Sequence, residues 1–508
     1  MEQKISETHS SGNPARDIVR KGSVITLITL ISRPLGYIRE AVQAYLFGAT
    51  LLVDAFIVAF NFPGLIQTLF FSGATSAFLI PVCTQYLHDR DEYSKIYSTF
   101  INLSILITFF VSIIFFIFSA TITGMIAPGF STAAKEITRN LFIIMIPVIS
   151  LQTLLSVMKA FLNAKEHFAA PELSGIFMNV AFIVAALTLK DRFGIYSLAI
   201  GVTAGAFIQI VMQYPYLRKL GIRYSFSMDF HHPSFAEAKS LFVGALIATS
   251  IVPINSFVGR IIASYLPHGE VASLAYAFRI FILPFSLFAV PVYTVMFSKI
   301  SRLYHDKDWH GIAVHTDSSF ILLCITLIPS TILLCTIGDI CTKILYERGA
   351  FKAHETYITN RALFGYSTGI IFYAFSISLV RIFNALHDMK TPALVGITSI
   401  FLNAVLAAIL MVPLKNLGIS LATSLVSFYN FVMLYFLLKK KIQYRMAEKT
   451  IREIIKALLA GIILTLTILL ARYIFIGNIY IILVSSALLT AVIYGLFFKN
   501  YYLAIFKK

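Results

Sequence analysis

Long apolar runs, cut by short polar stretches, follow one another along almost the whole chain of 508 residues. Runs of 18 residues or more predict membrane-spanning helices, because about 20 apolar residues in an α-helix cross the hydrocarbon core of a bilayer. The pattern predicts an all-α polytopic membrane protein with about fourteen spans, whose boundaries are good to about four residues. The predicted spans are 24–47, 54–86, 97–120, 136–163, 169–189, 194–217, 237–264, 270–300, 313–337, 356–386, 392–412, 416–438, 452–475 and 478–498.

The chain also repeats itself at an interval of about 220–224 residues. Chance similarity among apolar helices is the alternative, but the constant interval and the matched asparagine and proline positions argue against it. An even number of spans separates matching elements, which predicts parallel repeats related by an axis along the membrane normal. The matching pairs are Phe161–Ala164 with Ile382–Ala385, Pro171 with Pro392, Gly194–Ala199 with Gly418–Ala422, Tyr45-Leu46 with Tyr265-Leu266, and Pro63 with Pro284.

The repeats predict two pseudo-symmetric six-helix lobes followed by two extra helices. We expect a cytoplasmic tail at 1–22, an N-lobe at 23–222, a C-lobe at 223–441, and helices 13 and 14 with a second tail at 442–508. Parallel two-lobe transporters hold their substrate between the lobes near the middle of the membrane, so a binding site is expected there.

Composition agrees with a membrane protein, since 58% of the residues are hydrophobic and 13% are charged. The net charge of +17 is compatible with nucleic-acid binding, but in a membrane protein it more often reflects basic cytoplasmic loops. One alternating set of loops holds most of the lysines and arginines, which predicts that both termini are cytoplasmic. The four cysteines lack metal-site spacing and are expected to be free thiols.

Arginines inside the predicted spans are the main candidates for a binding site. Arg33 and Arg39 lie in the first span and Arg279 in the eighth. A cation at the bilayer centre costs about 2.5–3.5 kcal/mol, so such residues usually face a polar cavity. No acid lies four residues from Arg33, and Glu40 is expected to point elsewhere on the helix. Snorkelling of Arg33 to the membrane interface is the alternative.

Two further features bear on these arginines. Pro34 and Gly36 predict a bend or partial unwinding of the first helix, which would let both of its arginines reach one cavity. Arg260 is a second candidate in the C-lobe, with capping of an interface as an equal alternative. Planar guanidinium groups bind phosphate oxygens through paired hydrogen bonds, so convergent arginines suit an anionic diphosphate.

Motifs for catalysis are missing from the sequence. There is no Walker loop, no HExxH, no GxSxG and no carboxylate pair with catalytic spacing, so we expect no enzyme activity, no catalytic or metal-binding residue and no cofactor. The stretch Glu347–Phe351 lies in an outer loop, where a substrate contact and a capped entry into the next helix are equally compatible with it.

These segments resemble the MurJ (MviN) family of lipid II flippases, in the multidrug/oligosaccharidyl-lipid/polysaccharide (MOP) transporter superfamily. The resemblance covers almost the whole chain. It rests on Ser32–Glu40, Phe47–Ala49, Asp54–Phe56, Phe62-Pro63, Asn163-Ala164, Phe168–Pro171, Glu347–Phe351, Asn384–Leu386, Asp388 and Lys390–Pro392.

The resemblance implies a two-lobe helical fold with a cationic cavity and a substrate made of undecaprenyl diphosphate and a peptidoglycan precursor. It implies that Arg33, Arg39, Arg279 and Asp54 are substrate-binding residues. It also implies a groove for the lipid tail in the last two helices, 452–498. The implied location is the bacterial inner membrane, and the implied partners are lipid II, membrane lipids and cell-wall synthesis proteins, with no nucleic acid.

The chain departs from the family pattern at three positions. A basic pair and a glutamate expected in the second helix are missing around Gln67 and Ser72, and Phe278 replaces an aspartate before the eighth-helix arginine. Some relatives have a sodium site, of which Asn384 and Asp388 match a part, but the stretch 241–264 has no acid to complete it.

The sequence therefore predicts a flippase that moves a lipid-linked diphosphate glycan by alternating access. A sibling exporter of another lipid-linked oligosaccharide stays open as the alternative. A membrane glycosyltransferase would need a catalytic carboxylate motif that the outer loops lack. A non-transporting scaffold would not need buried arginines.

Overall fold

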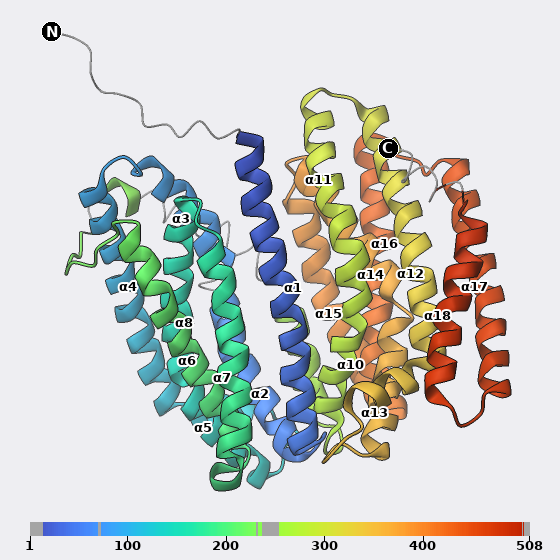
Figure 1. Ribbon diagram of the computed structural model, residues 1–508, viewed down its shortest axis with the longest axis horizontal. Coiled ribbons are helices and arrows are strands. Elements are labelled where there is room, and N and C mark those ends of the chain that lie inside the picture. Colours follow the sequence, from blue (N-terminus) through green and yellow to red (C-terminus); the bar gives the residue numbers. More distant parts are fainter. Residues whose placement is uncertain (1–13, 70–72, 230–231, 236–252, 500, 502–508) are drawn as a thin grey trace. The chain divides into compact units, whose positions relative to one another are not determined.

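The computed structural model describes residues 14–69, 73–229, 232–235, 253–499 and 501. Over these residues the chain is helical and forms no strand, as the apolar runs predict (Figure 1). The first repeat contains α1 (Pro14–Phe47), α2 (Leu51–Gln67), α3 (Gly73–Gln85), α4 (Arg90–Ile117), α5 (Ser119–Ile126), α6 (Thr132–Ala164), α7 (Ala169–Phe193) and α8 (Tyr196–Lys219).

The second repeat begins with a helix at 253–263, and the two extra helices follow it at the C-terminal end. Its further helices are α10 (Glu270–Pro284), η2 (Phe285–Ala289), α11 (Val290–His305), α12 (Trp309–Tyr346), α13 (Ala353–Ser367), α14 (Ile370–Ala385), α15 (Lys390–Leu414) and α16 (Asn416–Ile442), followed by α17 (Glu448–Ile474) and α18 (Ile479–Phe497).

Among the described residues, ten helices are long and apolar enough to cross a membrane, or eleven if the bent pair α13 and α14 forms one span. That pair is bent by 47°. The chain is therefore a multi-pass helical membrane protein, and the number fourteen stays a prediction. Most of the predicted seventh span, at 237–264, lies outside the described residues.

Several helices differ from their predicted spans. Within the predicted span 54–86, α2 ends at Gln67 and α3 begins at Gly73, and residues 70–72 lie outside the described residues. The predicted tail 1–22 is also partly helical, since α1 already begins at Pro14. Backbone hydrogen bonding continues a helix past the apolar run, so hydropathy locates the membrane crossing better than the helix end.

The predicted repeat is visible in two turns of the same geometry. α6 ends at Ala164 and α14 ends at Ala385, and each is followed by a residue in the left-handed region, Glu166 with φ 55° and His387 with φ 55°. The helices that follow, α7 and α15, have 25 residues each. An αL residue after a helix satisfies its last carbonyl groups, so both repeats use one device to reverse the chain.

α7 and α8 run side by side in the first repeat (Figure 1), and glycines allow their close approach. A Cβ atom at Gly201 would lie 3.1 Å from the Cα of Phe182, and one at Gly205 would lie 3.2 Å from the carbonyl oxygen of Met178. Small residues of this kind let membrane helices pack backbone to backbone.

The chain divides into two compact units, each of which is described by itself. Unit 1 consists of Met1–Val42, Ile66–Ile117 and Ile143–Leu246, and unit 2 of Gln43–Leu65, Phe118–Phe142 and Ile247–Lys508. Two segments of the first repeat thus pack with the second repeat in unit 2. The predicted lobes, which follow the repeat rather than the packing, stay a prediction.

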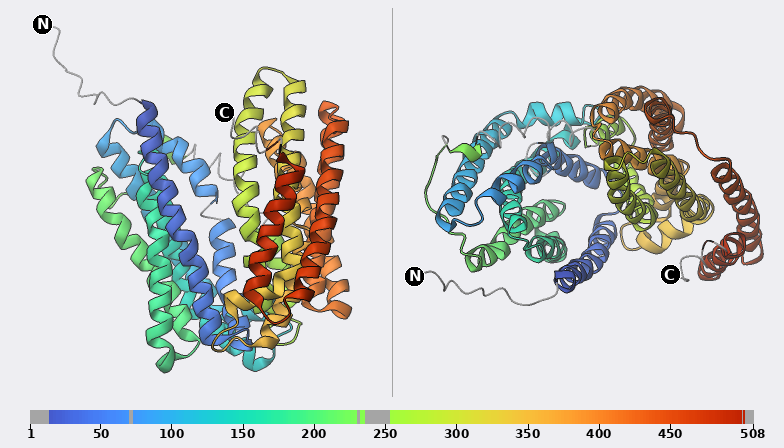
Figure 2. Two further views of the ribbon diagram at one scale, coloured as in Figure 1. Left: turned by 45° about the vertical axis from the view of Figure 1, so that its right-hand side comes forward. Right: turned by 90° about the horizontal axis from the view of Figure 1, so that it is seen from above.

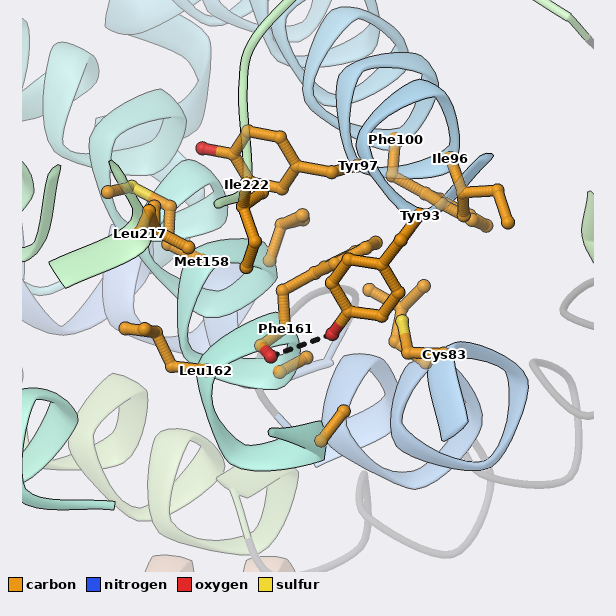
Figure 3. Close-up of a cluster of buried hydrophobic side chains, with 14 of the residues drawn as sticks. Cys83, Tyr93, Ile96, Tyr97, Phe100, Met158, Phe161, Leu162, Leu217 and Ile222 are labelled. Carbon is orange, nitrogen blue, oxygen red and sulfur yellow. Dashed lines mark hydrogen bonds between the residues drawn. The ribbon is translucent and has the colours of Figure 1, made fainter. Parts of the chain in front are cut away.

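The core of unit 1 includes a cluster of buried side chains from α3, α4, α6 and α8 (Figure 3). Tyr93 is 1% exposed, and its hydroxyl donates a 2.8 Å hydrogen bond to the carbonyl oxygen of Phe161. The rings of these two residues pack edge to face at 5.1 Å. A buried tyrosine needs such a partner, so this contact fixes α4 against the end of α6.

In unit 2, α17 and α18 pack as a pair along α12, and Figure 2 shows them at the margin of the C-terminal helices. Arg472 of α17 makes two hydrogen bonds with the Asp339 carboxylate, of 2.9 Å and 2.7 Å. Gly461 of the same helix faces Ile328 and Ile332 of α12. The predicted lipid-tail groove at 452–498 stays a prediction.

The glycine contacts generate a prediction for the α7–α8 pair. Gly205→Leu should destabilise the purified protein by about 1–3 kcal/mol, because the new side chain overlaps the Met178 backbone. Thermal unfolding in detergent measures the change. Gly175→Leu, in α7, is the matched control, since a Cβ there meets nothing within 4 Å. Equal loss of stability in both variants would contradict the packing argument.

Candidate functional site

Both first-helix arginines belong to unit 1 and lie six residues apart on α1, which corresponds to about 9 Å of rise. Arg33 is exposed and, in the part of the chain that the structure describes, forms no ion pair. The Arg39 side chain is 17% exposed, and its guanidinium carbon lies 5.4 Å from the centre of the Phe182 ring in α7. The cation–π contact holds Arg39 against the bundle, while Arg33 is left accessible.

The expectation that Glu40 points away from Arg39 is wrong. The Nη2 atom of Arg39 lies 3.4 Å from the Oε1 atom of Glu40, whose side chain is 11% exposed. Neighbouring residues diverge by about 100° around a helix, but both side chains are long enough to turn back toward each other. A carboxylate therefore partly neutralises one of the two arginines.

Pro34 and Gly36 do not unwind the first helix. α1 continues without a break from Pro14 to Phe47, with Pro34 inside it. A proline in a helix loses one backbone hydrogen bond, and here the surrounding turns keep their helical form. The predicted unwinding is therefore wrong, whereas a bend at this point stays a prediction.

Arg279 lies in unit 2, nine residues after the first residue of α10, and its side chain is exposed. Phe278 packs with the Phe281 and Tyr366 rings, each at 5.5 Å between centroids. The position where the family pattern has an acid is thus filled by an aromatic cluster. Gln67 is half-buried at the end of α2, and Ser72 lies outside the described residues.

Asp54 occupies a different environment from that of a ligand-binding carboxylate. It lies in the first turn of α2, is 1% exposed, and accepts hydrogen bonds from the backbone N–H groups of Gly269 at 2.6 Å and Ala272 at 2.7 Å. These donors belong to the first turn of α10, where a negative charge also interacts favourably with the helix dipole. Asp54 therefore caps a helix that lies more than two hundred positions further along the chain.

Three glycines complete this contact in unit 2. Gly269 has φ +86°, and a Cβ there would lie 2.2 Å from the carbonyl oxygen of Ala49. Gly48, with φ +67°, approaches Ala350 in the same way, and Gly349, with φ +58°, approaches Tyr45. In each case the backbone comes too close for any side chain, so glycine is required.

We call this set of contacts the seal. It also includes a 2.8 Å hydrogen bond from the Ala350 N–H to the Tyr45 carbonyl oxygen, and a 3.2 Å bond from the Tyr276 hydroxyl to the carbonyl oxygen of Gly48. Phe351 is 1% exposed and packs on Tyr276. The Glu347–Phe351 stretch thus closes over the end of α1. Sequence reasoning missed this role, although Gly349 in this stretch was a signal of close backbone packing.

At the predicted ion site, the carboxylate of Asp388 already forms hydrogen bonds within the protein. Asp388 accepts hydrogen bonds from the backbone N–H of Thr391 at 3.0 Å, from its hydroxyl at 2.8 Å, and from the Lys441 ammonium at 2.5 Å. Both carboxylate oxygens therefore serve the start of α15 and a lysine. Asn384 is half-buried one turn earlier, and an ion site here stays a prediction without a free carboxylate.

Within the described residues, no group of three or more His, Cys, Asp or Glu side chains is arranged to hold a metal ion. What the geometry offers is cationic side chains on membrane-length helices and a seal made by Asp54. Together with the matching turns after α6 and α14, these features are typical of a multi-pass helical protein of the transporter class.

The chain belongs to a particular transporter family. A family model described as lipid II flippase MurJ matches residues 43–500. A probable lipid II flippase MurJ of Vibrio cholerae is 28% identical over 466 residues, which cover 89% of this chain and 88% of that protein. One of Buchnera aphidicola is 28% identical over 456 residues, with 88% of each chain covered.

Solved structures agree with this assignment. A lipid II flippase MurJ in an inward closed conformation has a TM-score of 0.83 at 26% identity, with 95% of this chain and 99% of that chain covered. A multidrug resistance MATE family transporter of the MOP superfamily, in an inward-facing conformation, has a TM-score of 0.67 at 11% identity, with 82% and 96% covered. The second likeness shows the fold alone.

The seal generates a prediction about accessibility. Asp54→Ala removes two charge-assisted hydrogen bonds and should weaken the seal by about 1.5–3 kcal/mol. In a variant without the four native cysteines, a reporter cysteine at Ala49, which is 6% exposed, should then react faster with a membrane-impermeant maleimide. Asp54→Asn should lie between parent and Asp54→Ala, because it keeps one acceptor oxygen.

The control for this measurement is Asp191→Ala, which removes an exposed acid near the end of α7 in unit 1. Unchanged labelling in Asp54→Ala, with full labelling after unfolding, would show that Asp54 does not hold this end closed.

The Asp388 contacts generate a pH prediction. Burial acts to raise the pKa of Asp388, but the bonds from Lys441 and Thr391 outweigh it and bring the pKa below its ordinary value of 3.8. The contribution of Asp388 to stability is therefore complete above that ordinary value and is lost as the pH falls through the lowered one. The difference in melting temperature between parent and Asp388→Asn should be largest at neutral pH and vanish in strong acid. Sodium-dependent stabilisation of the parent alone would instead support the ion site.

Proposed function

We propose that this chain moves lipid II, an undecaprenyl diphosphate that carries a glycan, from the inner to the outer leaflet of a membrane. Family membership over residues 43–500 supports the substrate class. The single structural observation that carries the proposal is the set of arginines, Arg33, Arg39 and Arg279, on helices of that fold. A protein that served only as a membrane anchor or as a scaffold would not need arginines inside its membrane spans.

The chemistry of the substrate fits this set. A diphosphate presents several oxygen atoms with negative charge, and each planar guanidinium donates two parallel hydrogen bonds to such a group. Arginine keeps its charge in a partly buried site, because the guanidinium group is strongly basic. The headgroup would thus exchange its hydration for arginine contacts while the polyprenyl tail remains in lipid. No bond is made or broken, so the proposed function is transport.

Alternating access needs an end that closes and opens. With both termini in the cytoplasm, as the basic loops predict, the start of α2 and the start of α10 lie on the outer side. The seal would then be the outer gate, in its closed form. Its few hydrogen bonds and its glycine contacts are localised, so a modest free-energy difference suffices to open it.

The source of that free energy is proposed to be the membrane potential. Moving one elementary charge across 100 mV is worth about 2.3 kcal/mol. The diphosphate crosses with its negative charge toward the positive outer side, which is the favourable direction. Coupling to sodium has less support, because the Asp388 carboxylate is engaged by Lys441.

The chain would act in the cytoplasmic membrane of a bacterium, beside proteins of cell-wall synthesis that make and consume lipid II. A sibling exporter of another lipid-linked oligosaccharide is the second candidate. Gln67 and Phe278 favour this second candidate, because they replace charged residues that are common in the family.

Complementation tests the proposal. In a strain whose own lipid II flippase can be switched off, the parent chain should restore growth. Arg39→Ala and Arg279→Ala should lower transport by about tenfold to a hundredfold, the effect of losing about 1.5–3 kcal/mol of hydrogen bonding to a charged group. Arrival of lipid II at the outer leaflet measures transport directly.

The matched control is Arg192→Ala, which removes an exposed arginine from the last turn of α7. Rescue that survives both substitutions would remove Arg39 and Arg279 from the site. An abundant, correctly inserted parent that gives no rescue would favour the sibling exporter.

A further inference from the structure

A polar cavity of about 510 Å³, to which nothing above assigns a role, lies in unit 2. The last turns of α12, the first turns of α13, the end of α17 and the start of α18 surround it. Figure 1 shows these parts at the same end of the C-terminal helices. Cavities of about 300–1,000 Å³ are typical of sites that bind small molecules, so its size is sufficient for a ligand.

Two helix faces give the cavity its polar lining. On α12 these residues are Asp339, Lys343 and Glu347, spaced by four positions, and on α13 they are Thr356 and Asn360. Residues four positions apart lie on one face of a helix, about 6 Å apart along its axis. The hydroxyl of Thr356 donates a 2.6 Å hydrogen bond to the Glu347 carboxylate, which joins the two faces. The cavity thus presents charged and amide groups from two packed helices.

An ion pair fixes one wall of the cavity. Arg472 of α17 binds Asp339 through both of its terminal nitrogen atoms, and it also donates to the carbonyl oxygen of Thr336. That carbonyl lies beside Ile337, whose φ of −124° and ψ of 22° interrupt α12. Arg472 is therefore committed to α12. The Asp339 side chain is still 40% exposed, and a carboxylate has about four acceptor positions, so it can accept further N–H donors.

Lys343 and Asn360 have donors that the protein leaves available. The Lys343 ammonium lies 3.5 Å from the Glu347 carboxylate, beyond an ordinary hydrogen bond, and its side chain is 50% exposed. In the part of the chain that the structure describes, the Asn360 amide forms no hydrogen bond. A Cβ at Gly338 would lie 2.8 Å from its Oδ1 atom, so glycine makes room for this amide beside α12.

Exposed tyrosines indicate the depth of the cavity in the membrane. Tyr357, which lines it, is 61% exposed. Tyr473 at the end of α17 is 76% exposed, and Tyr480 at the start of α18 is 68% exposed. Tyrosines gather where the hydrocarbon of a bilayer meets its headgroups, because the ring is apolar and the hydroxyl is polar. The cavity is therefore at the level of lipid headgroups.

We propose that this cavity binds the headgroup of a zwitterionic phospholipid with a primary ammonium, phosphatidylethanolamine. Lys343 and Asn360 donate hydrogen bonds to its phosphate, and the Asp339 carboxylate accepts hydrogen bonds from its ammonium. Lys343 and Asp339 lie one helical turn apart, about 6 Å along α12, which suits a phosphate and an ammonium joined by two carbon atoms. The inference goes beyond the proposed transport and does not depend on it.

The charges around the cavity favour this lipid over other phospholipids. Asp339 and Glu347 balance Lys343 and Arg472, so a headgroup without net charge leaves the cavity neutral. A headgroup with phosphate alone would bring an unbalanced negative charge toward two carboxylates. A choline headgroup has no N–H group to donate. Quaternary ammonium groups are bound by aromatic cages, whereas Tyr357 is the single aromatic side chain among the described residues of this lining.

Native mass spectrometry of the purified full chain tests the assignment. Phosphatidylethanolamine, phosphatidylcholine and phosphatidylglycerol with the same acyl chains are titrated in turn. The parent should bind one phosphatidylethanolamine about tenfold more tightly than either other lipid, the effect of one charge-assisted hydrogen bond. Lys343→Gln should lose about tenfold in affinity for phosphatidylethanolamine, whereas Lys343→Arg should retain most of it, because the cation is kept.

The control variant is Lys352→Gln, which removes an exposed lysine just before α13 and should keep the parental preference. Equal binding of phosphatidylethanolamine and phosphatidylcholine by the folded parent overturns the inference. Tighter binding of phosphatidylglycerol shows general attraction of an anionic lipid and overturns it as well. A preference that persists in folded Lys343→Gln removes Lys343 from the site. A merely structural role of Lys343 would weaken all three lipids alike, which also contradicts the inference.

Discussion

The carboxylate of Asp54 at the N-terminus of α10 is the interaction on which the architecture of unit 2 depends. Inside a membrane, the free N–H groups at a helix start have no water to bind, so they need a partner from the protein. Asp54 supplies it from the other repeat. The same bonds satisfy the carboxylate, whose burial would otherwise be costly. A single reciprocal contact thus joins two repeats at one end, and the glycines at 48, 269 and 349 let the backbones meet around it.

The charged residues divide into two groups with different tasks. The carboxylates Asp54, Asp339 and Asp388 are engaged by backbone donors, arginine or lysine, and they hold helices together. Arg39 lies beside Glu40 and against the Phe182 ring, whereas Arg33 is exposed and forms no ion pair within the described residues. This asymmetry explains how a membrane protein keeps cations at depth without a matching set of acids. The proposed substrate, a diphosphate, would balance part of this charge.

The two repeats share the same turn geometry but place different side chains around it. The turns after α6 and α14 have the same left-handed residue and lead into helices of the same length. Their surroundings differ, because Asp388 takes Lys441 as a partner in the second repeat only. The first helices of the repeats differ likewise: Arg39 has Glu40 beside it, whereas Arg260 forms no ion pair within the described residues. Duplication gives the scaffold, and the later substitutions give each half its chemistry.

The sequence by itself determined the all-α membrane fold and the positions of the arginines along the chain, because each depends on local hydropathy or on residue identity. It gave a wrong expectation where long side chains decide, as with Glu40 turning back to Arg39. Only the tertiary structure decided that Asp54 caps α10 and that Gly349 closes over Tyr45. These contacts join residues more than two hundred positions apart. No local pattern encodes which donor a carboxylate will meet once the helices have packed.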